Sequence, residues 1–303
     1  MEYAARLKGV AEGLKEELLV IMQVNFESAT ASSLDGWKGL INDPDLDGSF
    51  HINKGFRQAR QLLLDINRLG LPCGCEYLDT ITPQYLADLV SWAFVGERTC
   101  ASRAHRELAS GLSTPVGFFK DSVRDAIRNK EMVALDAVRA SGAPHAFLSV
   151  SKQGVAGIVE TTGNKDCHVV LQAGDADALK TACAALEKVD KAPRCMLDCP
   201  DAASAHKVAS LVSGGGRQAF GVLLPSFLKG GAQVLRPGGA GLTYGQSVTA
   251  PCMDWAATEA AIEHLASAIR QRRAASAPSP MGRAPSAQDL RGFDEGSKIE
   301  STD

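Results

Sequence analysis

Residues 167–224 read CHVVLQAGDADALKTACAALEKVDKAPRCMLDCPDAASAHKVASLVSGGGRQAFGVLL, and this stretch decides the fold class. Three short apolar runs, at 167–171, 194–199 and 219–224, alternate with two longer stretches in which apolar and polar residues recur at helical spacing. Buried strands separated by amphipathic helices are typical of a parallel sheet whose strands are connected by helices. The stretch therefore predicts an α/β fold.

The same alternation extends toward the N-terminus. Residues 1–17 are expected to form a helix that places five apolar side chains on one face: Ala4, Leu7, Val10, Leu14 and Leu18. Four more buried strands are expected, at 18–26, 73–78, 89–96 and 115–119. Seven strands after an initial helix predict a (β/α)8 TIM barrel whose first strand is missing, and that strand would precede residue 1.

Two segments depart from the repeated unit. The apolar runs 146–150 and 157–160 are joined by a short turn through 152–154, so residues 144–162 are expected to form an inserted β-hairpin. From residue 274 onward the chain is rich in Ala, Ser, Pro and Gly. We therefore expect a barrel over residues 1–273 and a disordered tail over 274–303.

Composition excludes several classes of protein. The 32 basic and 35 acidic side chains give a net charge of −3, whereas nucleic-acid binders need a basic face. No nucleic-acid partner is therefore expected. No apolar run reaches the roughly 20 residues of a membrane span, and the first residues do not form a signal peptide, so no membrane partner is expected and the predicted location is cytoplasmic. The eight cysteines lack zinc-site spacing and are interpreted as free, mostly buried thiols.

Several stretches of the sequence resemble a known family. They occur in order between about residue 2 and residue 273, and read GWKGLINDP (36–44), LLLDIN (62–67), ITPQYLADL (81–89), HRELASGL (105–112), PHAFLSV (144–150) and GNKDCH (163–168). The chain is identified by these motifs as similar to the type I 3-deoxy-D-arabino-heptulosonate 7-phosphate (DAHP) synthases. The resemblance implies a barrel of the DAHP synthase type.

The resemblance also implies a reaction. Enzymes of this family condense phosphoenolpyruvate with erythrose 4-phosphate, the entry step to aromatic amino acids, and use a divalent metal. In the family, Arg and Lys side chains hold two phosphates and a carboxylate, while a Cys, a His, a Glu and an Asp hold the metal that polarises the aldehyde.

The metal-ligand positions that the resemblance implies carry other residues here. The family's Gly-Pro-Cys-Ser segment is not found, and Asp201, Pro225 and Ala250 stand where the family has His, Glu and Asp. A single carboxylate cannot supply the three or four donors of a transition-metal site. Cys199 and His206 are close in sequence to Asp201, and we interpret them as a strand thiol and a histidine on a helix surface. We therefore expect this chain to hold no metal or other cofactor.

The phosphate-binding positions have changed in the same way. Gln23 and Gln172 stand where the family has Arg, and the loop that receives the sugar phosphate corresponds to residues 28–31. Lys120 is displaced by one position from the family's Lys, and because side chains alternate along a strand it would face away from the barrel mouth.

Three residues match family positions that contact phosphoenolpyruvate, namely Lys38, Glu76 and Arg98. Two interpretations of them stay open. They form either a weak phosphate site, to which the displaced Lys120 could add, or a residual network of ion pairs that supports the strand ends.

A regulatory pocket is also implied by the resemblance. In the family, aromatic amino acids inhibit from a pocket between the hairpin and the barrel helices, and the matching positions here keep the family's residue types: Asp79, Pro83, Gln84, Leu108, Leu112, Ser113, Phe147, Ser149 and Val159. The alternative is that these residues persist because the hairpin and the nearby helices make a subunit interface.

Three hypotheses follow for function, all within aromatic amino acid biosynthesis. The first, which we favour, is a non-catalytic family member that binds partner subunits or an aromatic effector. The second is an enzyme, either of the family's reaction or of a diverged reaction without metal, and the third is an incomplete gene product. Because a barrel that lacks one strand exposes two sheet edges, we expect a homo- or hetero-oligomer with DAHP synthase-type subunits.

Overall fold

The computed structural model describes residues 1–28, 37–119, 133–151 and 153–276. Within these ranges, seven parallel strands form one sheet in the order β1-β2-β3-β4-β7-β8-β9. The strands are β1 (Met22–Gln23), β2 (Cys73–Glu76), β3 (Trp92–Val95), β4 (Val116–Phe119), β7 (His168–Gln172), β8 (Cys195–Asp198) and β9 (Ala219–Leu223). All seven strands that the sequence predicts are confirmed.

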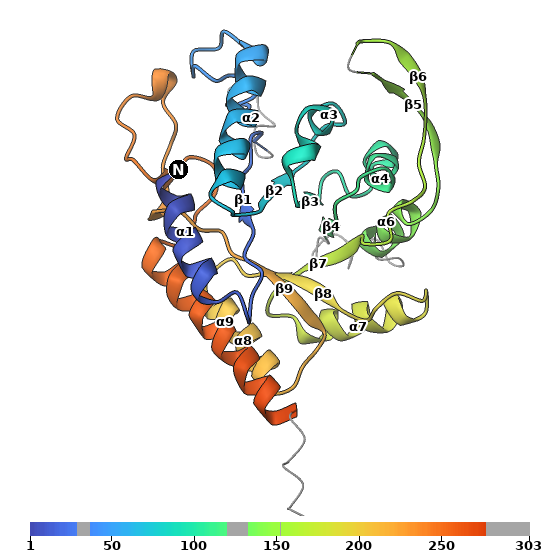
Figure 1. Cartoon of the computed structure of the whole chain (residues 1–303), viewed down its shortest axis with the longest axis vertical. Coiled ribbons are helices and arrows are strands. Elements are labelled where there is room, and N and C mark those ends of the chain that lie inside the picture. Colours follow the sequence, from blue (N-terminus) through green and yellow to red (C-terminus); the bar gives the residue numbers. More distant parts are fainter. Residues whose placement is uncertain (29–36, 120–132, 152, 277–303) are drawn as a thin grey trace, which may run out of the picture.

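Helices connect the strands and cover the outer face of the sheet (Figure 1). They are α1 (Glu2–Gly13), α2 (Ile52–Arg68), α3 (Thr82–Leu86) with a 3₁₀ turn η1 (Ala87–Leu89), α4 (Arg103–Ser110), α6 (Val133–Ser141), α7 (Ala176–Glu187), α8 (Ala202–Ser213) and α9 (Trp255–Ser276). A strand followed by a helix and a parallel neighbouring strand is the repeating unit of a TIM barrel. The sheet curls as in the (β/α)8 barrel that the sequence predicts, with β1 and β9 as the edges of the described sheet.

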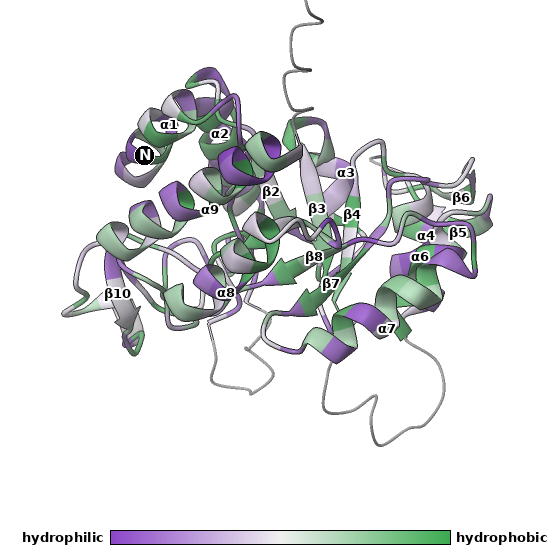
Figure 2. Cartoon of the chain, turned by 90° about the horizontal axis from the view of Figure 1, so that it is seen from below, coloured by the Kyte–Doolittle hydropathy of each residue, from purple (hydrophilic) through white to green (hydrophobic). Residues whose placement is uncertain are grey.

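The outer core lies between the sheet and the helices. Alternate strand residues face it, for example Cys75, Val95, Phe118 and Val169, all of which are buried. Figure 2 shows hydrophobic strands enclosed by helices whose exposed sides carry hydrophilic residues. Burial of a side chain the size of Phe118 contributes roughly 2–3 kcal/mol, so this layer is the main source of stability.

A second cluster fills the inner face of the curled sheet. Trp92, Phe94 and His168 lie there, with the ring centroids of Trp92 and Phe94 5.4 Å apart. The indole Nε1 of Trp92 donates to Nε2 of His168 at 3.1 Å, while Phe220 packs edge-on against His168 with ring centroids 5.0 Å apart. Burial lowers the pKa of His168, which keeps the imidazole neutral and able to accept from Trp92.

The inserted hairpin is confirmed as an antiparallel pair, β5 (Ala146–Val150) and β6 (Ala156–Glu160). Its base is held against α4, because the hydroxyls of Thr161 and Ser110 lie 2.7 Å apart. Asn164, in the motif that follows the hairpin, is buried and donates to the carbonyl oxygens of Ala109 and Thr114. This motif therefore has a structural role: it ties the end of α4 to the start of β4.

Three boundaries differ from the sequence prediction. The first helix ends at Gly13 rather than residue 17, because residues 14–17 form a turn. The strand expected over 18–26 is reduced to β1, since its ladder hydrogen bonds to the second strand end at Val24. Helix α9 continues to Ser276, so the tail begins later than 274; residues 277–303 lie outside the described residues.

One part of the fold is not anticipated by the sequence analysis. Between β9 and α9 the chain forms a parallel pair, β10 (Lys229–Ala232) and β11 (Gln246–Ser247), with a 3₁₀ turn η2 (Pro237–Gly239) between them. Its apolar content is too low for a strand signal, because β10 reads Lys-Gly-Gly-Ala. Among the described helices, none has both the length and the apolar composition that crossing a membrane requires.

Candidate functional site

The carboxyl ends of the strands form the candidate site, because catalytic groups of TIM barrels occupy this end. Side chains alternate along each strand, and Cys75, Leu171 and Leu197 belong to the outer core. Their neighbours Glu76, Gln172 and Asp198 therefore face the barrel interior, as does Gln23, which lies between two residues packed on the outer core. No residue of the seven described strands is Lys or Arg.

Two carboxyl groups at these strand ends are affected by burial. Burial raises the pKa of Glu76 to about 7 and the pKa of Asp198 to about 6. Glu76 also lies against the backbone of the next strand end, since a Cβ at Gly96 would be 2.4 Å from its Oε1. The inner strand ends thus hold two acids whose ionisation is opposed by burial, and Glu76 is one of the residues that the sequence analysis predicts for the site.

A third carboxyl group, Glu27, forms a pair with Asp79. Burial and the side-chain hydrogen bond to Asp79 raise the pKa of Glu27 to about 8, and the charge of Asp79 adds to the shift. Oε2 of Glu27 is buried without a hydrogen-bond partner among the described residues, so burial disfavours the ionised carboxylate, and the contact with Asp79 is made through Oε1. The Glu27 carboxyl group therefore donates to the Asp79 carboxylate near neutral pH.

Asp79 also fixes the start of α3. Its carboxylate accepts from the backbone N–H groups of Ile81 and Thr82 at 2.6 and 2.7 Å, and from the Thr82 hydroxyl at 2.9 Å. Burial raises the pKa of Asp79, but the hydrogen bonds from Glu27 and these groups outweigh burial, and the net shift is downward. The pair thus joins the chain beyond β1 to the first turn of α3.

The predicted cations lie at the rim of this end. Lys38 and Arg98 are exposed, in the loops that follow β1 and β3. A Cβ at Gly39 would lie 2.3 Å from the carbonyl oxygen of Phe26, so only glycine allows this loop to pack against the end of β1. Lys120 falls outside the described residues. The structure therefore places Lys38, Glu76 and Arg98 at or beyond the ends of three neighbouring strands, with Glu76 on the inner face of the sheet.

Asp201, at one of the family's metal-ligand positions, and the nearby Cys199 and His206 have other structural roles. Asp201 begins α8 with a capping box, in which its carboxylate accepts from the backbone N–H and hydroxyl of Ser204, both at 2.7 Å. Cys199 is buried in the outer core, and burial raises the pKa of its thiol to about 12. His206 is exposed on α8 and stacks on His264 of α9, with ring centroids 4.4 Å apart.

The nine predicted effector positions fall in three places. Phe147, Ser149 and Val159 share one face of the hairpin, since Phe147 is paired directly with Val159 and lies two residues from Ser149. The other six lie before or in α3 and at the end of α4: Asp79, Pro83, Gln84, Leu108, Leu112 and Ser113. Leu108 and Leu112 pack against the outer core. Whether these residues together bind a ligand stays a prediction.

Comparison with known proteins places this geometry in a family. The model of the DAHP synthetase I family matches residues 1–263. The Phe-sensitive phospho-2-dehydro-3-deoxyheptonate aldolase of Escherichia coli K12 is 46% identical over 287 residues, which cover 90% of this chain and 80% of that protein. The chain belongs to the DAHP synthetase I family. A putative phospho-2-dehydro-3-deoxyheptonate aldolase of Schizosaccharomyces pombe is 44% identical and covers 90% of this chain and 77% of its own length.

The structure of the phospho-2-dehydro-3-deoxyheptonate aldolase from Francisella tularensis SCHU S4 has the same fold. It superposes with a TM-score of 0.81 at 41% identity, over 90% of this chain and 82% of the solved chain. The family resemblance on which the sequence analysis relies is thus confirmed.

The residues present do not fit the divalent metal that membership of the DAHP synthetase I family implies. Asp201 is used to cap α8, Cys199 faces the outer core, and Pro225 and Ala250 have no donor atoms in their side chains. Within the described ranges, no group of three or more His, Cys, Asp or Glu side chains is arranged to hold a metal ion.

Sequence reasoning missed Glu27 and did not single out the role of Asp198. Glu27 directly follows the strand that the sequence predicts over 18–26. A polar residue at the end of a predicted strand was the signal that could have found it. Nothing local in the sequence indicates that Glu27 would meet Asp79, because the contact depends on how two neighbouring strands end.

Proposed function

We propose that this chain is a non-catalytic member of the DAHP synthetase I family. It acts in aromatic amino acid biosynthesis, in the cytoplasm, as a subunit that binds partner subunits or an aromatic amino acid. The observation that carries this proposal is the charge at the inner strand ends, where Glu76, Asp198 and the amides Gln23 and Gln172 stand.

The family reaction brings two phosphorylated substrates together. Phosphate groups are held in proteins by Arg, Lys and helix N-termini, often through paired hydrogen bonds. Glutamine offers an amide without charge, and an ionised Glu76 or Asp198 would repel a phosphate at close range in a region of low dielectric constant. The exposed cations Lys38 and Arg98 lie at the rim, where solvent weakens their attraction.

The test is a comparison with an active relative under the same conditions. The purified chain and the E. coli Phe-sensitive relative are analysed for bound metal, and each is then given phosphoenolpyruvate and erythrose 4-phosphate with added divalent metal. We expect no stoichiometric metal and no DAHP from this chain. Turnover near 1 per second that a chelator abolishes would refute the proposal.

The proposed partner surface is the hairpin. Leu148 and Ile158 are directly paired on one face, and their exposed fractions are 73% and 68%. Exposed apolar side chains gathered on a protruding element are typical of an interaction surface. The two edges of the described sheet, β1 and β9, offer backbone groups for a further strand. We therefore expect an oligomer, either of this chain or with DAHP synthase-type subunits.

Assembly is tested by sedimentation at micromolar concentration. Leu148→Lys combined with Ile158→Lys should shift the chain toward the monomer, because two charges would be placed on the hairpin face. Val234→Lys, a matched change at a side chain that is 83% exposed on the β10–β11 loop, should leave the assembly unchanged. A well-folded wild-type monomer would reject the proposed assembly.

The opposite face of the hairpin is the proposed effector site. The aromatic ring of Phe147 lies on this face with Ser149 and Val159, and Asp79 and Gln84 near α3 offer polar groups for an ammonium and a carboxylate. Burial of a phenyl ring contributes roughly 2–3 kcal/mol, and paired polar ends bring the dissociation constant to the micromolar-to-millimolar range.

Neighbouring residues on one strand supply the control for ligand binding. Calorimetry with phenylalanine, tyrosine and tryptophan should give a binding isotherm with the wild type. Phe147→Ala should abolish it, whereas Leu148→Ala, on the other face of the same strand, should preserve it. If none of the three gives heat or a thermal shift at about 10 mM, well above a weak site's dissociation constant, these residues serve packing alone.

One observation favours a second candidate function. The chain is 46% identical to the Phe-sensitive E. coli enzyme over 90% of its length. Such extensive identity favours a chain that keeps the family's activity or a diverged form of it. If DAHP does form, the variants Glu76→Ala and Arg98→Ala distinguish the family's metal-dependent reaction from a diverged reaction without metal. Loss of activity in either variant without dependence on metal would indicate a diverged enzyme that uses these residues.

A further inference from the structure

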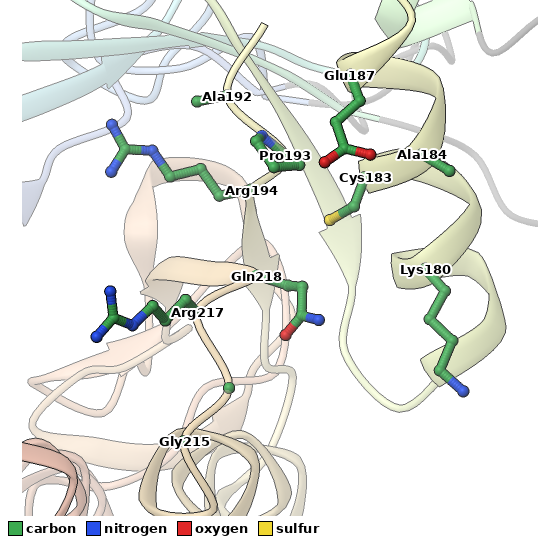
Figure 3. Close-up of a pocket in the computed structure, with 11 residues that line it drawn as sticks. Lys180, Cys183, Ala184, Glu187, Ala192, Pro193, Arg194, Gly215, Arg217 and Gln218 are labelled. Carbon is green, nitrogen blue, oxygen red and sulfur yellow. The ribbon is translucent and has the colours of Figure 1, made fainter. Parts of the chain in front are cut away.

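A groove of about 710 Å3 lies at the amino ends of β8 and β9, the end of the sheet opposite the candidate site (Figure 3). Helix α7 forms one wall, and the segments that lead into β8 and β9 form the other. We call it the basal groove. Its charged lining residues are Lys180, Arg194, Arg217 and Glu187, which gives an excess of positive charge.

The charges of the two arginines are not neutralised within the described structure. Arg194 and Arg217 are exposed, and no described carboxylate pairs with either guanidinium group; Arg194 lies over the ring of Phe220 at 5.8 Å. In Figure 3 both guanidinium groups extend away from α7, each from its own segment, while Glu187 and Gln218 project between the walls. Oε1 of Gln218 is buried, and no described residue donates to it. The basal groove therefore carries two cations without a carboxylate partner among the described residues.

The C-terminal helix ends beside this groove. Arg272, in the last turns of α9, donates to the carbonyl oxygen of Gly216, a lining residue, at 3.2 Å. The chain therefore leaves α9 at Ser276 close to the wall that carries Arg217.

The sequence beyond α9 has matching chemistry in its last part. Residues 277–288 contain one charged residue, Arg283. Residues 289–303 read DLRGFDEGSKIESTD and contain five acidic and two basic side chains, with Leu290, Phe293 and Ile299 as apolar side chains. An acidic segment with spaced apolar residues is complementary to a groove with two free arginines and apolar walls.

We propose that residues 289–303 dock in the basal groove of their own chain. The acidic side chains around Phe293 pair with Arg194 and Arg217, and apolar residues of the segment contact the groove walls. The twelve residues 277–288 suffice as a connection, because a chain of this length can span up to about 40 Å when fully extended. This inference does not rest on the proposed function.

Because the segment is tethered to the groove, even a weak interaction keeps it docked in most molecules. A short connection gives an effective concentration of about 1 mM, so a segment with a dissociation constant near 100 μM would be docked about ten times as often as undocked. Proteolysis that is slow relative to opening follows the undocked population. Docking should thus slow cleavage within the segment about tenfold.

The experiment is limited trypsin cleavage of the full chain, followed by mass spectrometry. Arg291 and Lys298 lie in the proposed docked segment, and Arg283 in the connection is the internal reference site. We expect cleavage at Arg291 and Lys298 about tenfold slower than at Arg283. Arg194→Glu combined with Arg217→Glu should remove this protection, as should 0.5 M salt, because the contacts are between charges exposed to solvent.

A charge-matched control separates docking from a general effect of charge. Arg57→Glu combined with Lys229→Glu makes the same change at exposed residues of α2 and β10 and should preserve the protection. Equal cleavage at the three sites in the wild type would overturn the proposal. Protection that survives Arg194→Glu with Arg217→Glu would also overturn it, and protection that rises with chain concentration would show docking onto a second copy instead.

Discussion

The carboxyl pair between Glu27 and Asp79 makes stability depend on pH in a direction that can be measured. Glu27 has a pKa of about 8 in the folded chain against an ordinary value of 4.5. Because the folded state holds this proton more tightly, the stabilisation is fully present below pH 4.5 and is lost as the pH rises through 8. Glu27→Gln keeps a donor to Asp79 but cannot ionise, so the variant should be the more stable protein at pH 9.

The magnitude follows from the pKa shift. One pKa unit corresponds to about 1.4 kcal/mol, so the full shift sets a ceiling near 5 kcal/mol. Glu27 is only partly buried and shares its proton with Asp79, and both facts reduce the effect. We expect Glu27→Gln to unfold with a free energy about 1–2 kcal/mol above that of the wild type at pH 9, and with a similar one near pH 5.

The assay is urea unfolding followed by far-ultraviolet circular dichroism at pH 5, 7 and 9. Glu76 and Asp198, whose pKa values burial also raises, titrate in both proteins and cancel in the comparison. Glu259→Gln, at an exposed position of α9, serves as the matched control and should run parallel to the wild type. If Glu27→Gln also runs parallel from pH 5 to 9, the proton is not held between Glu27 and Asp79 and the reasoning is wrong.

Three further substitutions test the packing around the candidate site. Because burial lowers the pKa of His168, the wild type should lose stability as the pH falls through 6.5. His168→Gln still offers an acceptor to Trp92 but does not titrate, so it should lose less stability in urea unfolding between pH 7 and 5. Phe118→Ala should lower the free energy of unfolding by about 3–5 kcal/mol, because it leaves a cavity in the outer core. Asn164→Ala should cost about 1–3 kcal/mol by removing two hydrogen bonds, to the carbonyl oxygens of Ala109 and Thr114, whereas the exposed neighbour Lys165→Ala should change stability by less than about 0.5 kcal/mol in the same unfolding assay.

The sequence by itself determined the order of the elements. The apolar runs within 167–224 and their counterparts upstream became the seven parallel strands, and the pair of runs around Gly154 became the hairpin. These features could be predicted because strand and helix periodicity are local properties of a chain. The number of repeated strand–helix units predicted a barrel, and the family motifs supported it, since a barrel's closure and strand order do not follow from any single segment.

The tertiary structure alone decided which side chains meet and in what state. Glu27 and Asp79 share a proton because two neighbouring strands end side by side. The end of α9 lies beside the basal groove because Arg272 reaches Gly216 across the fold. Desolvation, proton sharing and long-range hydrogen bonds depend on distance in space, and distance in space is not a property of residue spacing along the chain.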